Sequence, residues 1–166
     1  MKTDQNLADA FAGESQANRK YLAYGEAAAK DKLPQVAKLF RAVAAAETIH
    51  AHAHLRALGG IKSTTENLKA AISGEKHEFE AMYPEFIATA EAEGAAVAAL
   101  SMTRAMAVEK IHHGLFSDAL AAVEAGHDLS ADSIHVCEVC GHTVIGDVPD
   151  SCPVCKAGAA RFKEVA

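Results

Sequence analysis

One internal repeat constrains the fold of this chain more than any other feature of its sequence. Glu14 recurs 61 residues later as Glu75, each directly after a Gly, and the Glu-x-x-His motif of Glu47 recurs 62 residues later at Glu109. Each copy thus carries one Glu in a first helical stretch and a Glu-x-x-His in a second. Two consecutive helix pairs of one plan can build a single pseudo-twofold four-helix bundle.

Hydrophobic spacing and capping signals predict where the helices begin and end. Pro34 suits the first turn of the second helix, and Gly59-Gly60 end it. Pro84 removes one backbone hydrogen bond from the third helix and is expected to kink it. The predicted helices span about residues 3–30, 34–58, 64–93 and 95–125.

The last forty residues lack the helical spacing of the preceding part of the chain. The polar segment 126–133 is typical of a linker, and short β-favouring runs then surround four cysteines. We therefore expect two domains, a helical bundle over residues 1–130 and a small loop-rich cysteine module over residues 131–166.

Composition narrows the classes of function. Half of the 166 residues are apolar, and many of them are alanine, which favours packed helices. The net charge of −6 leaves no basic face for a nucleic acid. No apolar run approaches the roughly 20 residues that span a membrane, and the N-terminus lacks the apolar core of a signal peptide. We expect a cytoplasmic protein with neither a nucleic-acid nor a membrane partner.

The repeat also predicts a metal site. Residues three apart share a helical face, so Glu47 and His50 can reach one metal together, as Glu109 and His112 can. With a rise of about 1.5 Å per residue, the four repeated glutamates fall at one depth of the bundle. Four carboxylates and two imidazoles are the ligand set of di-iron or di-manganese carboxylate proteins.

Glu78 breaks the symmetry of the two copies. It follows Glu75 by one helical turn, whereas its counterpart in the first copy is Ala17. One metal is thereby offered an additional carboxylate, which suits an iron that changes charge. Tyr21 and Tyr83 occupy matched places, where they can pack or donate a hydrogen bond to a carboxylate ligand. Surface, supporting or core roles are expected for the side chains that do not repeat, namely His52, His54, His77, His113, Met82, Met102 and Met106.

All four cysteines belong to two Cys-x-x-Cys pairs, Cys137 with Cys140 and Cys152 with Cys155. Four thiolates on two tight turns form a tetrahedral cage that suits zinc or iron. In a chain without an export signal this pattern indicates metal binding in a reducing compartment, not disulfides. The spacing leaves both metals open, and the neighbouring redox-capable site favours iron, because zinc cannot pass electrons.

The motifs "FAGESQA", "AETIH", "GEKHEFEAMYPEF", "VEKIHHGLF" and "CEVCG…DSCPVC" occur in that order, and with them the whole chain resembles the rubrerythrins. The resemblance implies an all-α, ferritin-like four-helix bundle with a small C-terminal rubredoxin-like β and knuckle domain. It implies that the di-iron ligands are Glu14, Glu47, His50, Glu75, Glu78, Glu109 and His112, and that Cys137, Cys140, Cys152 and Cys155 hold a single iron. It also implies catalytic roles for Glu47, Glu109, Glu78 and His50, with one iron exchanging Glu78 for His50 on reduction.

The activity that the resemblance implies is reduction of hydrogen peroxide, in defence against oxidative stress. Electrons would come from rubredoxin or an NAD(P)H-dependent reductase through the cysteine-bound iron. The chain has no Gly-x-Gly-x-x-Gly after a strand, so the donor must bring its own nucleotide. Two alternatives are an iron-storage protein and a zinc-ribbon adaptor on a degenerate bundle. The cysteine module argues against storage, and the complete ligand set argues against the adaptor.

Two further expectations concern the cysteine turn and the assembly. Lys156 follows the last cysteine, where rubredoxin-like turns usually have Gly, and this can alter the geometry and potential of that iron. The link from Gly59 to Thr65 reaches only about 20–25 Å, whereas the second helix is about 37 Å long. The third helix therefore either folds back antiparallel or enters the bundle of a partner. We expect a homodimer with exchanged helix pairs.

Overall fold

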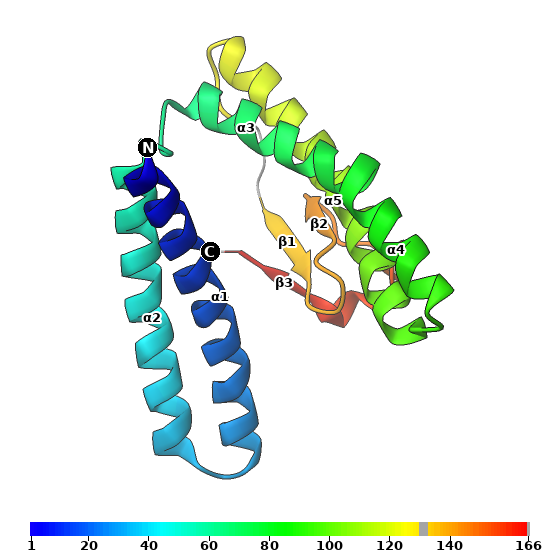
Figure 1. The fold of residues 1–166 in the computed structure, drawn as a ribbon. Coiled ribbons are helices and arrows are strands. Elements are labelled where there is room, and N and C mark those ends of the chain that lie inside the picture. Colours follow the sequence, from blue (N-terminus) through cyan, green and yellow to red (C-terminus); the bar gives the residue numbers. More distant parts are fainter. Residues whose placement is uncertain (130–132, 166) are drawn as a thin grey trace. The chain divides into compact units, whose positions relative to one another are not determined.

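The computed structural model describes residues 1–129 and 133–165, and the chain divides into two compact units, Met1–Lys62 and Ser63–Ala166 (Figure 1). The first unit contains α1 (Lys2–Lys30) and α2 (Pro34–Ala57). The second contains α3 (Thr64–His77), the π-helical turn η1 (Glu78–Met82), α4 (Tyr83–Ala92), α5 (Ala96–Glu124), β1 (Ile134–Cys137), β2 (Thr143–Ile145), the 3₁₀ turn η2 (Ala159–Arg161) and β3 (Phe162–Glu164). None of the helices in the described ranges is long and apolar enough to cross a membrane.

The first unit is a helical hairpin (Figure 1). Its buried seam consists mostly of small residues. On α2, Ala37, Ala44 and Ala51 are buried and recur every seven residues, as do Asn18 and Gly25 on α1. A seven-residue repeat keeps one stripe of a helix facing its partner. A Cβ atom at Gly25 would lie 3.3 Å from the Ala37 carbonyl oxygen, so the two backbones approach closely there.

The third helical stretch begins with a capping box and contains a wide turn. The Ser63 hydroxyl accepts the Glu66 N–H, and the Glu66 carboxylate reaches back to the Ser63 N–H. We predicted a kink at Pro84. The structure places the π-helical turn η1 just before it, with the Tyr83 N–H donating to the Glu78 carbonyl. Pro84 has no N–H to donate, so even a regular α-helix would lack one backbone hydrogen bond at this point. The wider turn lies where that bond is missing.

The cysteine module is a three-stranded antiparallel sheet in the order β2-β1-β3. Cys137, Cys152 and Phe162 are buried at its centre. The β-favouring runs of the sequence coincide with these strands, and the four long helical stretches precede them. The predicted fold class is therefore confirmed, whereas residues 130–132 of the predicted linker lie outside the described residues.

Candidate metal centre

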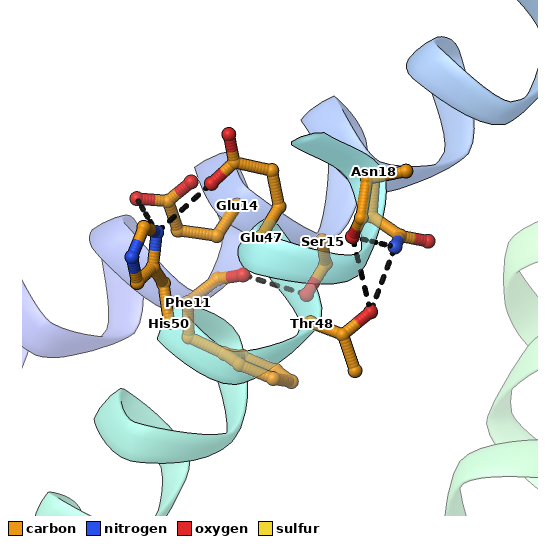
Figure 2. A network of polar contacts seen from close by, with 8 residues as sticks. Phe11, Glu14, Ser15, Asn18, Glu47, Thr48 and His50 are labelled. Atoms are coloured by element: carbon orange, nitrogen blue, oxygen red, sulfur yellow. Dashed lines mark hydrogen bonds and ion pairs between the residues drawn. The ribbon is translucent and has the colours of Figure 1, made fainter. Parts of the chain in front are cut away.

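Three predicted ligands of the first repeat converge in the α1–α2 hairpin (Figure 2). Glu14 comes from α1, and Glu47 and His50 come from α2; one ligand atom from each lies within 4.8 Å of the others. His50 Nδ1 is 2.9 Å from Glu47 Oε2 and 3.9 Å from Glu14 Oε1. The hairpin thus presents two carboxylates and one imidazole as a half-site, the donor types that iron accepts.

Asn18, one turn beyond Glu14, fixes how the two helices align (Figure 2). Its buried Nδ2 donates to the Ala44 carbonyl at 2.7 Å and to Thr48 Oγ1 at 2.8 Å. The Thr48 hydroxyl in turn donates to the Ala44 carbonyl at 3.2 Å. A single polar residue in a helical seam specifies register at some cost in stability. The register chosen here brings Glu14 alongside Glu47.

The second half-site repeats this arrangement in the second unit. Glu75 from α3 meets Glu109 and His112 from α5, again with ligand atoms within 4.8 Å of one another. His112 Nδ1 is 2.8 Å from Glu109 Oε2. Burial raises the pKa of Glu75, and the negative charge of Glu109 raises it further, partly opposed by His112. Two carboxylates this close require a proton or a cation between them, and a bound metal supplies that positive charge.

Glu78 is the first residue of η1, and Tyr83 directly follows its last residue. Glu78 is not among the converging ligand atoms of the described residues. Burial raises the pKa of Tyr83, and the negative charges of Glu109, Glu78 and Glu75 raise it further. The Tyr83 hydroxyl therefore stays protonated at neutral pH, within electrostatic reach of three carboxylates.

Aromatic contacts locate two further residues singled out from the sequence, Tyr21 and His113. Tyr21 packs against Tyr24 and Phe40, with ring centroids 6.3 and 6.1 Å apart. The His113 ring meets Phe79 edge to face at 5.5 Å. Tyr21 thus packs within the first unit, whereas His113 packs on Phe79 and also acts electrostatically on Glu75, opposing the rise of its pKa.

The second ring nitrogen of His112 joins the helices to the cysteine module. Nε2 lies 3.1 Å from Thr143 Oγ1 and 3.4 Å from the Gly141 carbonyl oxygen. The Thr143 hydroxyl donates to the same carbonyl at 3.1 Å. An imidazole that binds metal through Nδ1 carries its proton on Nε2 and donates it outward, as this geometry allows. Gly141 directly follows Cys140, so these contacts connect a predicted ligand of the carboxylate site with the cysteine site.

The four cysteines surround a common centre. Cys137 Sγ lies 3.6 Å from Cys155 Sγ, and Cys140 Sγ lies 3.6 Å from Cys152 Sγ. A disulfide requires about 2.05 Å, whereas thiolates bound at about 2.3 Å to one tetrahedral ion lie roughly 3.8 Å apart. All four thiols are free. The cage therefore fits a single metal ion and excludes the disulfide alternative.

The thiols of the cage differ in acidity. Burial raises the pKa of Cys140 to about 12, although the backbone N–H of His142 opposes the shift. Burial acts in the same direction on Cys152, but N–H donors outweigh it and lower its pKa to about 6. Those donors are the backbone amides of Cys155 and Val154 and the ring of His142. Of these two thiols, Cys152 is thus the one whose thiolate the protein stabilises before a cation binds.

Lys156 adopts the turn that its position requires. Its φ of 64° matches the φ of 84° at Gly141 in the other turn. The backbone N–H of each residue donates to the carbonyl of the first cysteine of its pair, Gly141 to Cys137 at 2.8 Å and Lys156 to Cys152 at 2.9 Å. The lysine side chain folds back and donates to the Pro153 carbonyl. A left-handed non-glycine residue costs about 1–2 kcal/mol, but the backbone turn is the same.

Comparisons with known proteins agree with these sites. A family model described as rubrerythrin matches residues 5–120, and one described as the rubrerythrin rubredoxin-like domain matches residues 135–163. Rubrerythrin-2 of Clostridium acetobutylicum is 33% identical over 95% of this chain and 93% of its own length. The rubrerythrin of Porphyromonas gingivalis is 34% identical over 98% of this chain and 89% of its own.

Solved structures of nigerythrin in mixed-valence and all-ferrous states are also similar. They are 33% and 32% identical to this chain, with TM-scores of 0.58 and 0.59, and the matches cover 98% of this chain and 86% of theirs. With the ligand groups described above, these matches confirm the predicted cofactors, a di-iron pair and one iron at four cysteines.

Proposed function

Because the chain belongs to the rubrerythrin family, whose members are oxidoreductases, we propose that it is a peroxidase that reduces hydrogen peroxide to water. The reaction takes one H₂O₂, two electrons and two protons and yields two molecules of water. The observation that carries the proposal is the contact of His112 Nε2 with Thr143 Oγ1 and with the Gly141 carbonyl, to which the Thr143 hydroxyl also donates. This contact links a carboxylate half-site to a redox-capable cysteine site. An iron store has no need of that link.

We assign the iron pair to the two half-sites. Its ligands would be Glu14, Glu47, His50, Glu75, Glu109 and His112, which converge in two groups. Glu78, one helical turn after Glu75, would be the additional carboxylate. When bound, the iron pair supplies two electrons at one place, as cleavage of the peroxide O–O bond requires. The carboxylates balance the charge of the ions in both oxidation states. Catalytic roles follow for Glu47 and Glu109, the glutamates of the two Glu-x-x-His motifs, and for Glu78 and His50, which would exchange as ligands of one iron.

Electrons reach this centre through the cysteine module. Cys137, Cys140, Cys152 and Cys155 would hold an iron that accepts electrons one at a time from a donor protein of the rubredoxin type or an NAD(P)H-dependent reductase. From Cys140 the path runs along one peptide unit to the Gly141 carbonyl and then across the hydrogen bond to His112. Thr143 holds both the carbonyl and the imidazole in place.

The two kinds of metal site also support a division of the chain into two domains. We propose a di-iron domain over residues 1–130 and an iron–cysteine domain over residues 131–166, in line with family matches that end at residue 120 and resume at residue 135. Four free thiols support a reducing compartment such as the cytoplasm.

The assembly that we propose is a homodimer with exchanged helix pairs. Ferritin-like bundles run their second and third helices parallel, so the link between them must travel along the bundle. Here the link, residues 58–63, reaches roughly 20–25 Å when extended, and α2, with 24 residues, is about 36 Å long. Each di-iron site would then combine Glu14, Glu47 and His50 of one copy with Glu75, Glu109 and His112 of the other.

Donor-coupled peroxide consumption tests the proposal. The iron-loaded protein should oxidise a reduced electron carrier when peroxide is added, and Glu109→Ala should abolish this. Cys152→Ser should also abolish it, yet its iron pair, reduced chemically, should still be oxidised by peroxide. Full donor-coupled turnover in Cys152→Ser would refute the relay. Iron uptake far beyond two ions per bundle, without peroxide consumption, would favour storage.

A further inference from the structure

His142 is a buried polar side chain that the proposed electron path does not use. It is only 7% exposed, and its ring meets Phe162 edge to face at 5.7 Å. Its Nδ1 lies 3.6 Å from Cys152 Sγ. A buried imidazole held against a metal-binding sulfur calls for a physical explanation, because burying a polar ring is costly unless it gains a partner.

The backbone of His142 is held as firmly as its ring. Its carbonyl accepts the Cys137 N–H at 2.9 Å, and its own N–H donates to the Cys140 sulfur. His142 therefore contacts three of the four cysteines, two through its backbone and Cys152 through its side chain. The ring has little freedom to leave the sulfur.

The chemistry of the sulfur decides which way the hydrogen bond runs. A metal-bound cysteine is a thiolate and has no proton to give. His142 Nδ1 must therefore carry the hydrogen and donate it to Cys152 Sγ, which selects one tautomer of the neutral ring. The backbone amides of Cys155 and Val154 also donate to this sulfur, so Cys152 Sγ has three N–H donors.

We propose that His142 raises the reduction potential of the cysteine-bound iron through this N–H···S hydrogen bond. The inference rests on the proposed function in that the cage holds iron and relays electrons. Four thiolates carry one net negative charge around ferric iron and two around ferrous iron. A hydrogen-bond donor stabilises the more negative, reduced form more strongly, and hydrogen bonds to sulfur are an established determinant of such potentials. The ring thereby makes this iron easier for the donor protein to reduce.

The test is a redox titration of the iron-loaded full-length chain without peroxide, following the visible absorption of the ferric–thiolate centre. His142→Leu and His142→Asn form a matched pair, because the two side chains have similar shapes and only Asn keeps an N–H near the Nδ1 position. At a fixed applied potential, His142→Leu should lower the ratio of reduced to oxidised iron about tenfold, equivalent to a downward shift of 59 mV. His142→Asn should retain most of the wild-type ratio.

His135→Phe is the control for a ring change in the same module. His135 lies in β1, and its buried Nδ1 has no hydrogen-bond partner in the part of the chain that the structure describes. Its replacement should leave the potential unchanged. Equal potentials for wild type and His142→Leu, or equal shifts for the Leu and Asn variants, would overturn the proposal. The titration contains no peroxide, so a protein without peroxidase activity would still show the predicted shift in potential. Failure of the proposed function can therefore be told apart from failure of this inference.

Discussion

Asn18 shows how one side chain controls the geometry of a metal half-site. Replacing it with Ala removes two hydrogen bonds across the α1–α2 seam and should cost about 1–2 kcal/mol of unfolding free energy. It should also lower the iron content, because Glu14 and Glu47 are no longer held level. Urea unfolding and iron analysis measure the two effects. Gln16→Ala, an exposed change on the same helix, is the control and should change neither the unfolding free energy nor the iron content. An Asn18→Ala protein with wild-type iron content would contradict the role assigned to Asn18.

Glu75 gives the metal-free protein a pH dependence of known sign. Its pKa is raised in the folded state, so folding is favoured while the carboxyl is protonated, and this contribution is lost as pH rises through the folded pKa. With a chelator present, Glu75→Gln should therefore melt above wild type at neutral pH, and the difference should shrink on acidification below the ordinary Glu pKa. Iron should reverse the order, because only wild type keeps the ligand. A difference in melting temperature between the two proteins that stays constant from neutral pH to below the ordinary Glu pKa would contradict a raised pKa of Glu75 in the folded state.

At the scale of helices, the wide turn η1 separates Glu75 from Tyr83. A π-helical turn holds one residue more than the α-helix around it, so deletion of the exposed Ala81 should restore a regular helix and keep both flanks in register. We expect unchanged helix content by circular dichroism and a loss of peroxide turnover of about tenfold or more, because Glu78 is displaced. Undiminished turnover would mean that the wide turn has no part in positioning Glu78.

The repeat made the helices and the ligand triplets predictable, because helical periodicity relates residues that are close in sequence. Glu47 and His50 illustrate this, since a spacing of three already puts them on one face. Asn18 and His142 were not predicted to act on the sites. Asn18 bonds across 26 residues to Ala44, and His142 meets its sulfur only when the two cysteine turns fold together. Pro84 predicted an interruption, but not that a wide turn would accommodate it.

At the scale of the whole molecule, helix exchange predicts complementation between two inactive variants. Glu47→Ala disables the half-site of the first unit, and Glu109→Ala that of the second. In an exchanged heterodimer one site receives both defects and the other receives neither. Refolding the two chains together should therefore restore about a quarter of wild-type turnover if they pair at random.

Light scattering should report dimers throughout, and each variant refolded alone is the control. A mixture as inactive as its components would show that each chain completes its own site.

The central claim is that this chain reduces peroxide with a pair of iron ions. The most direct test is anaerobic stopped-flow mixing of the fully reduced, iron-loaded protein with either H₂O₂ or O₂. The account predicts that one equivalent of H₂O₂ oxidises one iron pair, and does so much faster than O₂. Faster oxidation by O₂, or reduced iron that persists in excess peroxide, would contradict it.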